Sequence, residues 1–155
     1  MSNESAVNAR RKAREMALCA SYAFDLSQNE ADNVIKDLIE GKDNRKAVTQ
    51  FAEKLFLTAV EHIPELDDII KRKALNWEFN RIAIIDKLIL RMALCEFLYF
   101  PDIPPKVSIN EAIEISKMYS TSKSGKFING ILDSVLDEFR KKDLIHKTGR
   151  GLMSG

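Results

Sequence analysis

The chain has 155 residues, of which 45% are hydrophobic and 30% are charged, and its formal net charge is +1. This balance is typical of a folded globular protein and excludes general disorder. The length suits one compact domain or two small helical lobes that share a core. Because the net charge is close to zero, total charge alone does not indicate a nucleic-acid partner.

Charge is unevenly distributed along the chain. Residues 1–14 contain four basic residues and one acidic residue, residues 117–126 contain three lysines and no acid, and residues 25–40 are acidic. Segregated charge can give a nearly neutral protein a basic face that attracts phosphates. Solvated helix faces that bind nothing would produce the same pattern, so charge leaves both interpretations open.

The cysteines and the apolar segments bear on where the protein works. Cys19 and Cys95 lie in apolar helical stretches, where we expect buried thiols in a reducing cytoplasm. The basic N-terminus is not followed by the apolar core of a secretion signal, so we expect a cytoplasmic protein. Four charged residues interrupt the most apolar stretch, 82–100, which favours a buried central helix over a membrane span.

The pattern of apolar residues is helical throughout, with a period of about 3.6 residues and no segment that alternates like a half-buried strand. The first predicted helix covers about 5–26 and has a stripe of small and apolar residues. The second covers about 30–40 and ends at Gly41, as at a helix C-cap. The third covers about 44–62, and Pro64 then suits the first turn of a short fourth helix.

Two helix starts are predicted in the middle of the chain. Asn80 is an N-cap candidate for a fifth helix that continues to about Tyr99. A proline-rich connection follows and enforces extended backbone. Ser108 and Glu111 then have the spacing of a capping box, which predicts the start of a sixth helix ending near Tyr119.

The polar run 120–125 predicts a loop, and a seventh helix follows it to about Lys141. We therefore expect an all-α fold of about seven helices in two packed helical lobes. A single helical domain would cover 1–142, divided into lobes of about 1–63 and 64–142, with a flexible tail over 143–155.

Sequence signatures of catalysis are missing. No glycine pattern of a nucleotide-binding loop is present, and the carboxylates lie on polar helix faces, where solvation explains them. His62 and His146 show no paired ligand pattern, and we expect each at the surface rather than on a metal. We therefore expect no enzymatic activity, no metal site and no cofactor.

Basic residues on the first predicted helix suggest RNA binding. Arg10, Arg11 and Arg14 fall within about 100° of each other on a helical wheel, and Tyr22 continues the face of Arg11. Guanidinium groups pair with phosphates and stack on bases, and tyrosine adds a stacking surface. Pairing of these arginines with acids such as Glu15 is the structural alternative.

The seventh predicted helix carries a second basic and aromatic face. Phe127 lies beside the apolar stripe, on a face shared with Lys123, Lys126 and Gly130. An aromatic ring on a basic face near a helix N-terminus has the ingredients of a base-stacking platform. Gly130 costs about 1 kcal/mol relative to Ala in a helix, which RNA or another helix close to the backbone would explain. Phe127 could instead fill a gap between helices, and Tyr119 could belong to the core or to the platform.

Longer segments carry a family resemblance. Residues 105–117 (PKVSINEAIEISK) and 126–133 (KFINGILD) resemble the C-terminal signature of the NusB family of transcription antitermination factors. Residues 86–93 (DKLILRMA) resemble its fifth-helix pattern, and the basic segment 10–22 resembles its first helix. The resemblance covers about residues 8–139 and implies an all-α fold of two helical lobes.

The resemblance also implies a function and a set of contacts. Family members bind the single-stranded boxA element of nascent RNA, chiefly in ribosomal RNA operons. They do so with the ribosomal protein that acts as NusE, within the antitermination complex of RNA polymerase. The positions that correspond to RNA contacts are Arg10, Arg11, Arg14, Tyr22, Tyr119, Lys126 and Phe127. Asp86 matches a position on the surface that the family offers to NusE, although a local salt bridge is the alternative.

The chain departs from the family pattern at a few positions. Lys123 stands where an acidic residue is more usual, so we expect it to contact RNA and to strengthen binding without the protein partner. Cys19 and Ser21 replace the more usual Gln and Leu, so the packing around Tyr22 need not follow the family. We expect the site where the first helix meets the loop and first turn of the seventh.

Two other classes of function stay open at this point. Similar helical modules precede the Rossmann-like domain of RNA cytosine methyltransferases, but the sequence shows no glycine-rich cofactor loop of that kind. A helical scaffold that binds proteins and ignores RNA is the other class. A homodimer is also open, with the small-residue first helix as a plausible interface.

Overall fold

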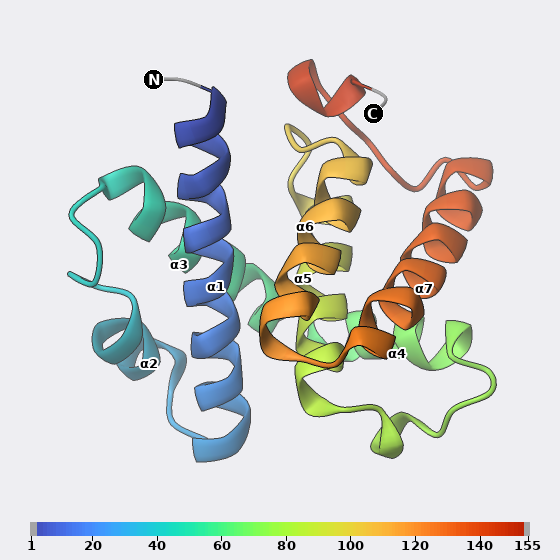
Figure 1. Ribbon diagram of the computed structural model, residues 1–155, viewed down its shortest axis with the longest axis horizontal. Coiled ribbons are helices and arrows are strands. Elements are labelled where there is room, and N and C mark those ends of the chain that lie inside the picture. Colours follow the sequence, from blue (N-terminus) through green and yellow to red (C-terminus); the bar gives the residue numbers. More distant parts are fainter. Residues whose placement is uncertain (1–2, 154–155) are drawn as a thin grey trace. The chain divides into compact units, whose positions relative to one another are not determined.

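The computed structural model describes residues 3–153, which form seven α-helices and two short 3-10 helices without a β-strand (Figure 1). The expected all-α class is therefore confirmed. The chain divides into two compact units, Met1–Glu61 and His62–Gly155. This division falls two residues before the one expected from the sequence.

Unit 1 contains α1 (Asn3–Ser27), α2 (Ala31–Leu38) and α3 (Lys46–Glu61). Its core forms where α1 packs against α3, with α2 in contact with both. Ala13, Ala17 and Ala20 of α1 are completely buried, because small side chains allow a neighbouring helix to approach closely. The small-residue face of α1 is therefore used within the chain, and a homodimer formed through the first helix stays a prediction.

Unit 2 contains α4 (Ile63–Lys73), η1 (Phe79–Arg81), α5 (Ile84–Tyr99), α6 (Pro105–Tyr119), α7 (Ser122–Lys141) and η2 (Gly149–Leu152). The expected buried central helix is confirmed, because α5 is buried from Leu88 to Phe97 and contacts α4, α6 and α7. Arg91 of α5 adds a two-point ion pair to Asp67 of α4, with Nε 2.6 Å from Oδ1 and Nη2 2.9 Å from Oδ2. Apolar packing and this ion pair thus attach α5 to its neighbouring helices.

Two predicted helix starts are wrong. Helix α6 begins at Pro105, whose fixed φ and missing N–H suit the first helical position. Ser108 is therefore inside the helix, where its hydroxyl donates to the buried carboxylate of Glu96 (2.7 Å) instead of forming a capping box. Asn80 belongs to η1, and the N-cap of α5 is Ala83.

The predicted loop 120–125 is also largely wrong, because α7 already begins at Ser122. Thr121 is its N-cap residue, in an extended conformation. The connection between α6 and α7 is thus only Ser120 and Thr121. This short turn holds the end of α6 close to the start of α7, and the two helices run side by side in Figure 1.

The described part of the C-terminal tail, within unit 2, folds back onto the end of α5. The Lys147 ammonium donates hydrogen bonds to the carbonyl oxygens of Glu96 (2.9 Å) and Phe100 (2.8 Å), at the C-terminal end of α5. A cation there also interacts favourably with the helix dipole. The flexibility expected for residues 143–155 stays a prediction, whereas the contacts of Lys147 define where the tail lies.

Candidate nucleic-acid interface

Two arginines of α1 that are predicted to contact RNA lie over the same aromatic ring of α3. The Cζ atoms of Arg10 and Arg14 lie 4.1 Å and 5.4 Å from the ring centroid of the buried Phe51. Such cation–π contacts hold guanidinium groups in place. Arg10 is exposed, so a phosphate or base can reach it, whereas only 4% of Arg14 is exposed. RNA contact by Arg14 stays a prediction, and the structure gives it a packing role over Phe51.

The remaining candidates on α1 lie at its surface. Arg11 is half-buried, and Tyr22 is 38% exposed. The expectation of a buried Cys19 is wrong, because Cys19 is exposed near Lys12 and Glu15, whereas Cys95 is buried as expected. Partial burial, and then the Glu15 carboxylate, raise the pKa of the Cys19 thiol, while Lys12 opposes them. Cys19 is therefore held as a neutral thiol on the same helix as Tyr22.

The first turns of α7 are exposed and basic. Lys123 and Lys126 are both exposed, and the first turn of α7 contains no acidic residue. Tyr119, the last residue of α6, is 41% exposed. A β-carbon added at the exposed Gly130 would meet no atom of the described residues within 4 Å. The hypothesis that another helix of the chain requires this glycine is therefore wrong.

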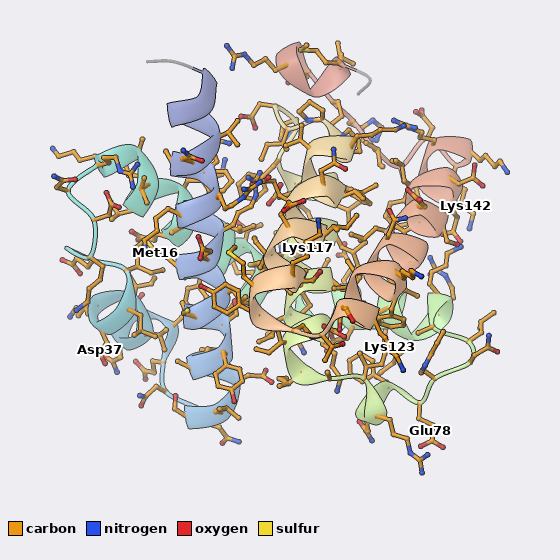
Figure 2. All side chains as sticks on the ribbon, viewed as in Figure 1. Met16, Asp37, Glu78, Lys117, Lys123 and Lys142 are labelled. Carbon is orange, nitrogen blue, oxygen red and sulfur yellow. The ribbon has the colours of Figure 1, made fainter. Side chains whose placement is uncertain are left out.

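Phe127 has an aromatic neighbour that the sequence did not predict. Its half-buried ring lies edge-to-face with Trp77, with centroids 5.0 Å apart and ring planes at 68°. Trp77 belongs to the segment between α4 and α5, and 54% of it is exposed. Figure 2 shows Lys123 at the start of α7 and Glu78 below it in the α4–α5 segment. The ring of Phe127 therefore packs on one side against Trp77, while part of it stays exposed at the surface.

A second aromatic residue of the same segment lies beneath two lysines. The Nζ atoms of Lys71 and Lys87 are 4.9 Å and 4.3 Å from the ring centroid of Phe79. Sequence reasoning missed Trp77 and Phe79. The available signal was the occurrence of two large aromatic residues in a short connection between helices, where no core stripe requires them.

Asp86, expected on a partner-binding surface, is buried with 6% exposure. Its Oδ1 accepts a hydrogen bond from the Ser120 hydroxyl and its Oδ2 accepts one from Ser124, both at 2.8 Å. A carboxylate in the first turn of α5 is also favoured by the helix dipole. Asp86 thus connects α5 to the α6–α7 turn and fixes the start of the helix that carries Lys123 and Lys126. Contact with a protein partner stays a prediction.

Other kinds of site are scarce in the described residues. No group of three or more His, Cys, Asp or Glu side chains within residues 3–153 is arranged to hold a metal ion. None of the described helices combines the length and apolarity needed to cross a membrane. His146 is exposed, whereas His62 is half-buried and stacks on Tyr99 with ring centroids 4.0 Å apart.

Comparison with known proteins addresses the family directly. The NusB family model matches residues 11–137. The chain belongs to the NusB family. Its sequence is 46% identical over 145 residues to transcription antitermination protein NusB of Chloroherpeton thalassium, covering 93% of this chain and 69% of that protein. The resemblance expected from the sequence is therefore confirmed.

Solved structures of NusB proteins share the fold. T. maritima NusB is 33% identical, with a TM-score of 0.77, and the match covers 83% of this chain and 91% of that one. A chain in the crystal structure of antitermination factors NusB and NusE with double-stranded RNA is 28% identical, with a TM-score of 0.76 and coverage of 84% and 98%. Every candidate RNA-contact residue except Arg10 lies within the range matched by the NusB family model.

Proposed function

We propose that this protein is an RNA-binding transcription antitermination factor that binds boxA RNA together with a ribosomal protein acting as NusE. The observation that carries the proposal is the exposed pair Lys123 and Lys126 beside the half-buried aromatic ring of Phe127 at the start of α7. Membership of the NusB family and the likeness to a chain from a NusB–NusE–RNA structure support it.

The chemistry of this surface suits a single-stranded nucleic acid. Lysine side chains and the backbone N–H groups of a helix N-terminus bind phosphate oxygens. The half-exposed ring of Phe127 and the exposed ring of Tyr119 offer surfaces for base stacking, which single strands permit because their bases are unpaired. On unit 1, the exposed Arg10 and Tyr22 offer the same two kinds of contact.

We further propose that the protein acts by binding rather than catalysis, in the cytoplasm, within the antitermination complex of RNA polymerase on ribosomal RNA operons. A homodimer formed through the first helix remains a prediction. Sedimentation velocity across a range of protein concentrations would test it, and a concentration-independent monomer would contradict it.

Titration of labelled boxA RNA and a scrambled RNA, with and without NusE, tests the proposal. We expect tighter binding to boxA, further tightening by NusE, and an affinity that falls steeply with salt because several phosphates are neutralised. Lys126→Gln should weaken binding, whereas Lys106→Gln, an exposed lysine in the first turn of α6, serves as the matched control. Equal, negligible binding of both RNAs in every condition would instead favour a protein-interaction scaffold.

A further inference from the structure

An aromatic and basic cluster of unit 2 has no role in the contacts proposed so far. We define the α4–α5 cluster as Lys71, Trp77, Phe79 and Lys87. It adjoins the start of α7 through the contact between Trp77 and Phe127, whose ring centroids are 5.0 Å apart. The proposed RNA surface therefore continues onto the α4–α5 segment.

The exposure of Trp77 indicates a binding role. Tryptophan has the largest side chain of the standard residues, and 54% of Trp77 is exposed, next to Leu75 at 83%. Burying such surface against a ligand is favourable, and an indole ring is large, flat and suited to stacking. Its position is defined, because its backbone N–H donates to the Ala74 carbonyl (3.1 Å) and its ring contacts Phe127. A defined ring loses little conformational freedom on binding.

The charges around the cluster indicate an anionic occupant. Lys71 and Lys87 flank the Phe79 ring, and the exposed Arg81 lies at the end of the same segment. Glu78, the acid within the α4–α5 segment itself, is 3.5 Å from Arg81 in an exposed ion pair. A basic protein would be repelled by these lysines, and an apolar peptide would not need them. A polyanion with planar bases satisfies both the charges and the rings.

We propose that the α4–α5 cluster binds single-stranded RNA that continues past Phe127, with one base stacked on Trp77 and phosphates at Lys71 and Lys87. This inference rests on the proposed RNA-binding function and extends its contact surface. It predicts that an RNA longer than the boxA element gains affinity from its flanking nucleotides, and that this gain depends on Trp77.

Trp77 is the only tryptophan in the chain, so intrinsic fluorescence reports on this position alone. We expect RNA that contains boxA with flanking nucleotides to change Trp77 fluorescence with the same Kd as the anisotropy of a labelled copy. Trp77→Ala should weaken the binding of this RNA by about tenfold, within the range for one stacked base. Trp77→Phe should recover part of the loss, and circular dichroism should show unchanged helix content in both variants.

Salt dependence tests the two lysines separately from the ring. Binding becomes weaker as salt rises, so a plot of log K for RNA association against log salt has a negative slope. The double variant Lys71→Gln, Lys87→Gln should make this slope less steep by about 0.7 for each lost phosphate contact. Lys106→Gln should leave the slope unchanged. RNA binding by anisotropy without a change in Trp77 fluorescence, or with an unchanged salt slope in the double variant, overturns the inference and leaves the proposed function standing. Loss of NusE binding by Trp77→Ala with unchanged RNA affinity also overturns it and points to a protein contact. No RNA binding by wild type, with or without NusE, overturns both proposals.

Discussion

Replacement of Asp86 by Ala is the sharpest test of how unit 2 positions its basic face. The substitution removes one carboxylate and two hydrogen bonds of 2.8 Å, from Ser120 and Ser124. A hydrogen bond to a charged group contributes about 1.5–3 kcal/mol, and a buried hydroxyl that loses its acceptor adds a desolvation cost. We therefore expect Asp86→Ala to lower the free energy of unfolding by about 3 kcal/mol. The affinity for boxA should fall as well, because the start of α7 is no longer fixed.

Urea unfolding and RNA anisotropy on the same preparations measure both effects. Asp86→Asn keeps an acceptor oxygen and the shape of the side chain, so we expect about half the loss in stability. Combining Asp86→Ala with Ser120→Ala and Ser124→Ala should cost less than the sum of the separate substitutions, because all three belong to one network. The reasoning would be refuted if Asp86→Ala retained wild-type stability. Asp86→Asn with full stability and RNA binding but lost NusE binding would establish the partner contact instead.

Three further predictions concern α7. Lys123→Glu should weaken boxA binding without NusE by about tenfold at moderate salt, since it removes a cation and adds a repelled anion; an unchanged affinity would contradict a phosphate contact there. Gly130→Ala should stabilise the protein by about 1 kcal/mol, because a helical alanine is favoured and the added carbon meets nothing within 4 Å. It should also weaken RNA binding if RNA approaches that backbone, and equal affinity would exclude this close approach. Lys73, the main cause, and Arg72 hold the pKa of Glu138 below its usual value of 4.5. The unfolded state therefore binds more protons in acid than the folded state does. The free energy of unfolding of the wild type should fall as the pH drops below 4.5, and that of Glu138→Gln should fall less. Urea unfolding across pH 3 to 7 measures both.

Helical periodicity predicts the number and order of helices because each core stripe is a local property of the sequence. Helix starts are less predictable, because several local signals compete. At α6, the proline at position 105 determines the start, and Ser108, the expected cap, donates instead to Glu96 of another helix. Local spacing carries no information about that distant acceptor.

In the candidate site too, local features are predictable from the sequence and contacts between distant residues are not. Lys123, Lys126 and Phe127 lie on one helix, so a helical wheel brings them together without knowledge of the fold. The contact of Phe127 with Trp77 joins residues 50 positions apart, and the hydrogen bonds of Asp86 cross between helices. Only the tertiary structure reveals that the buried Asp86 carboxylate positions the start of α7 through these hydrogen bonds.

The attachment of Lys147 changes where the folded part of unit 2 ends. Helix α7 finishes at Lys141, and the sequence predicts a domain that stops at residue 142. A chain shortened to that point would lose the ammonium that donates to Glu96 and Phe100, at the end of the central helix. A form of the protein that keeps this anchor therefore extends past its last long helix, and an affinity tag or fusion partner should be added beyond residue 151 rather than directly after α7.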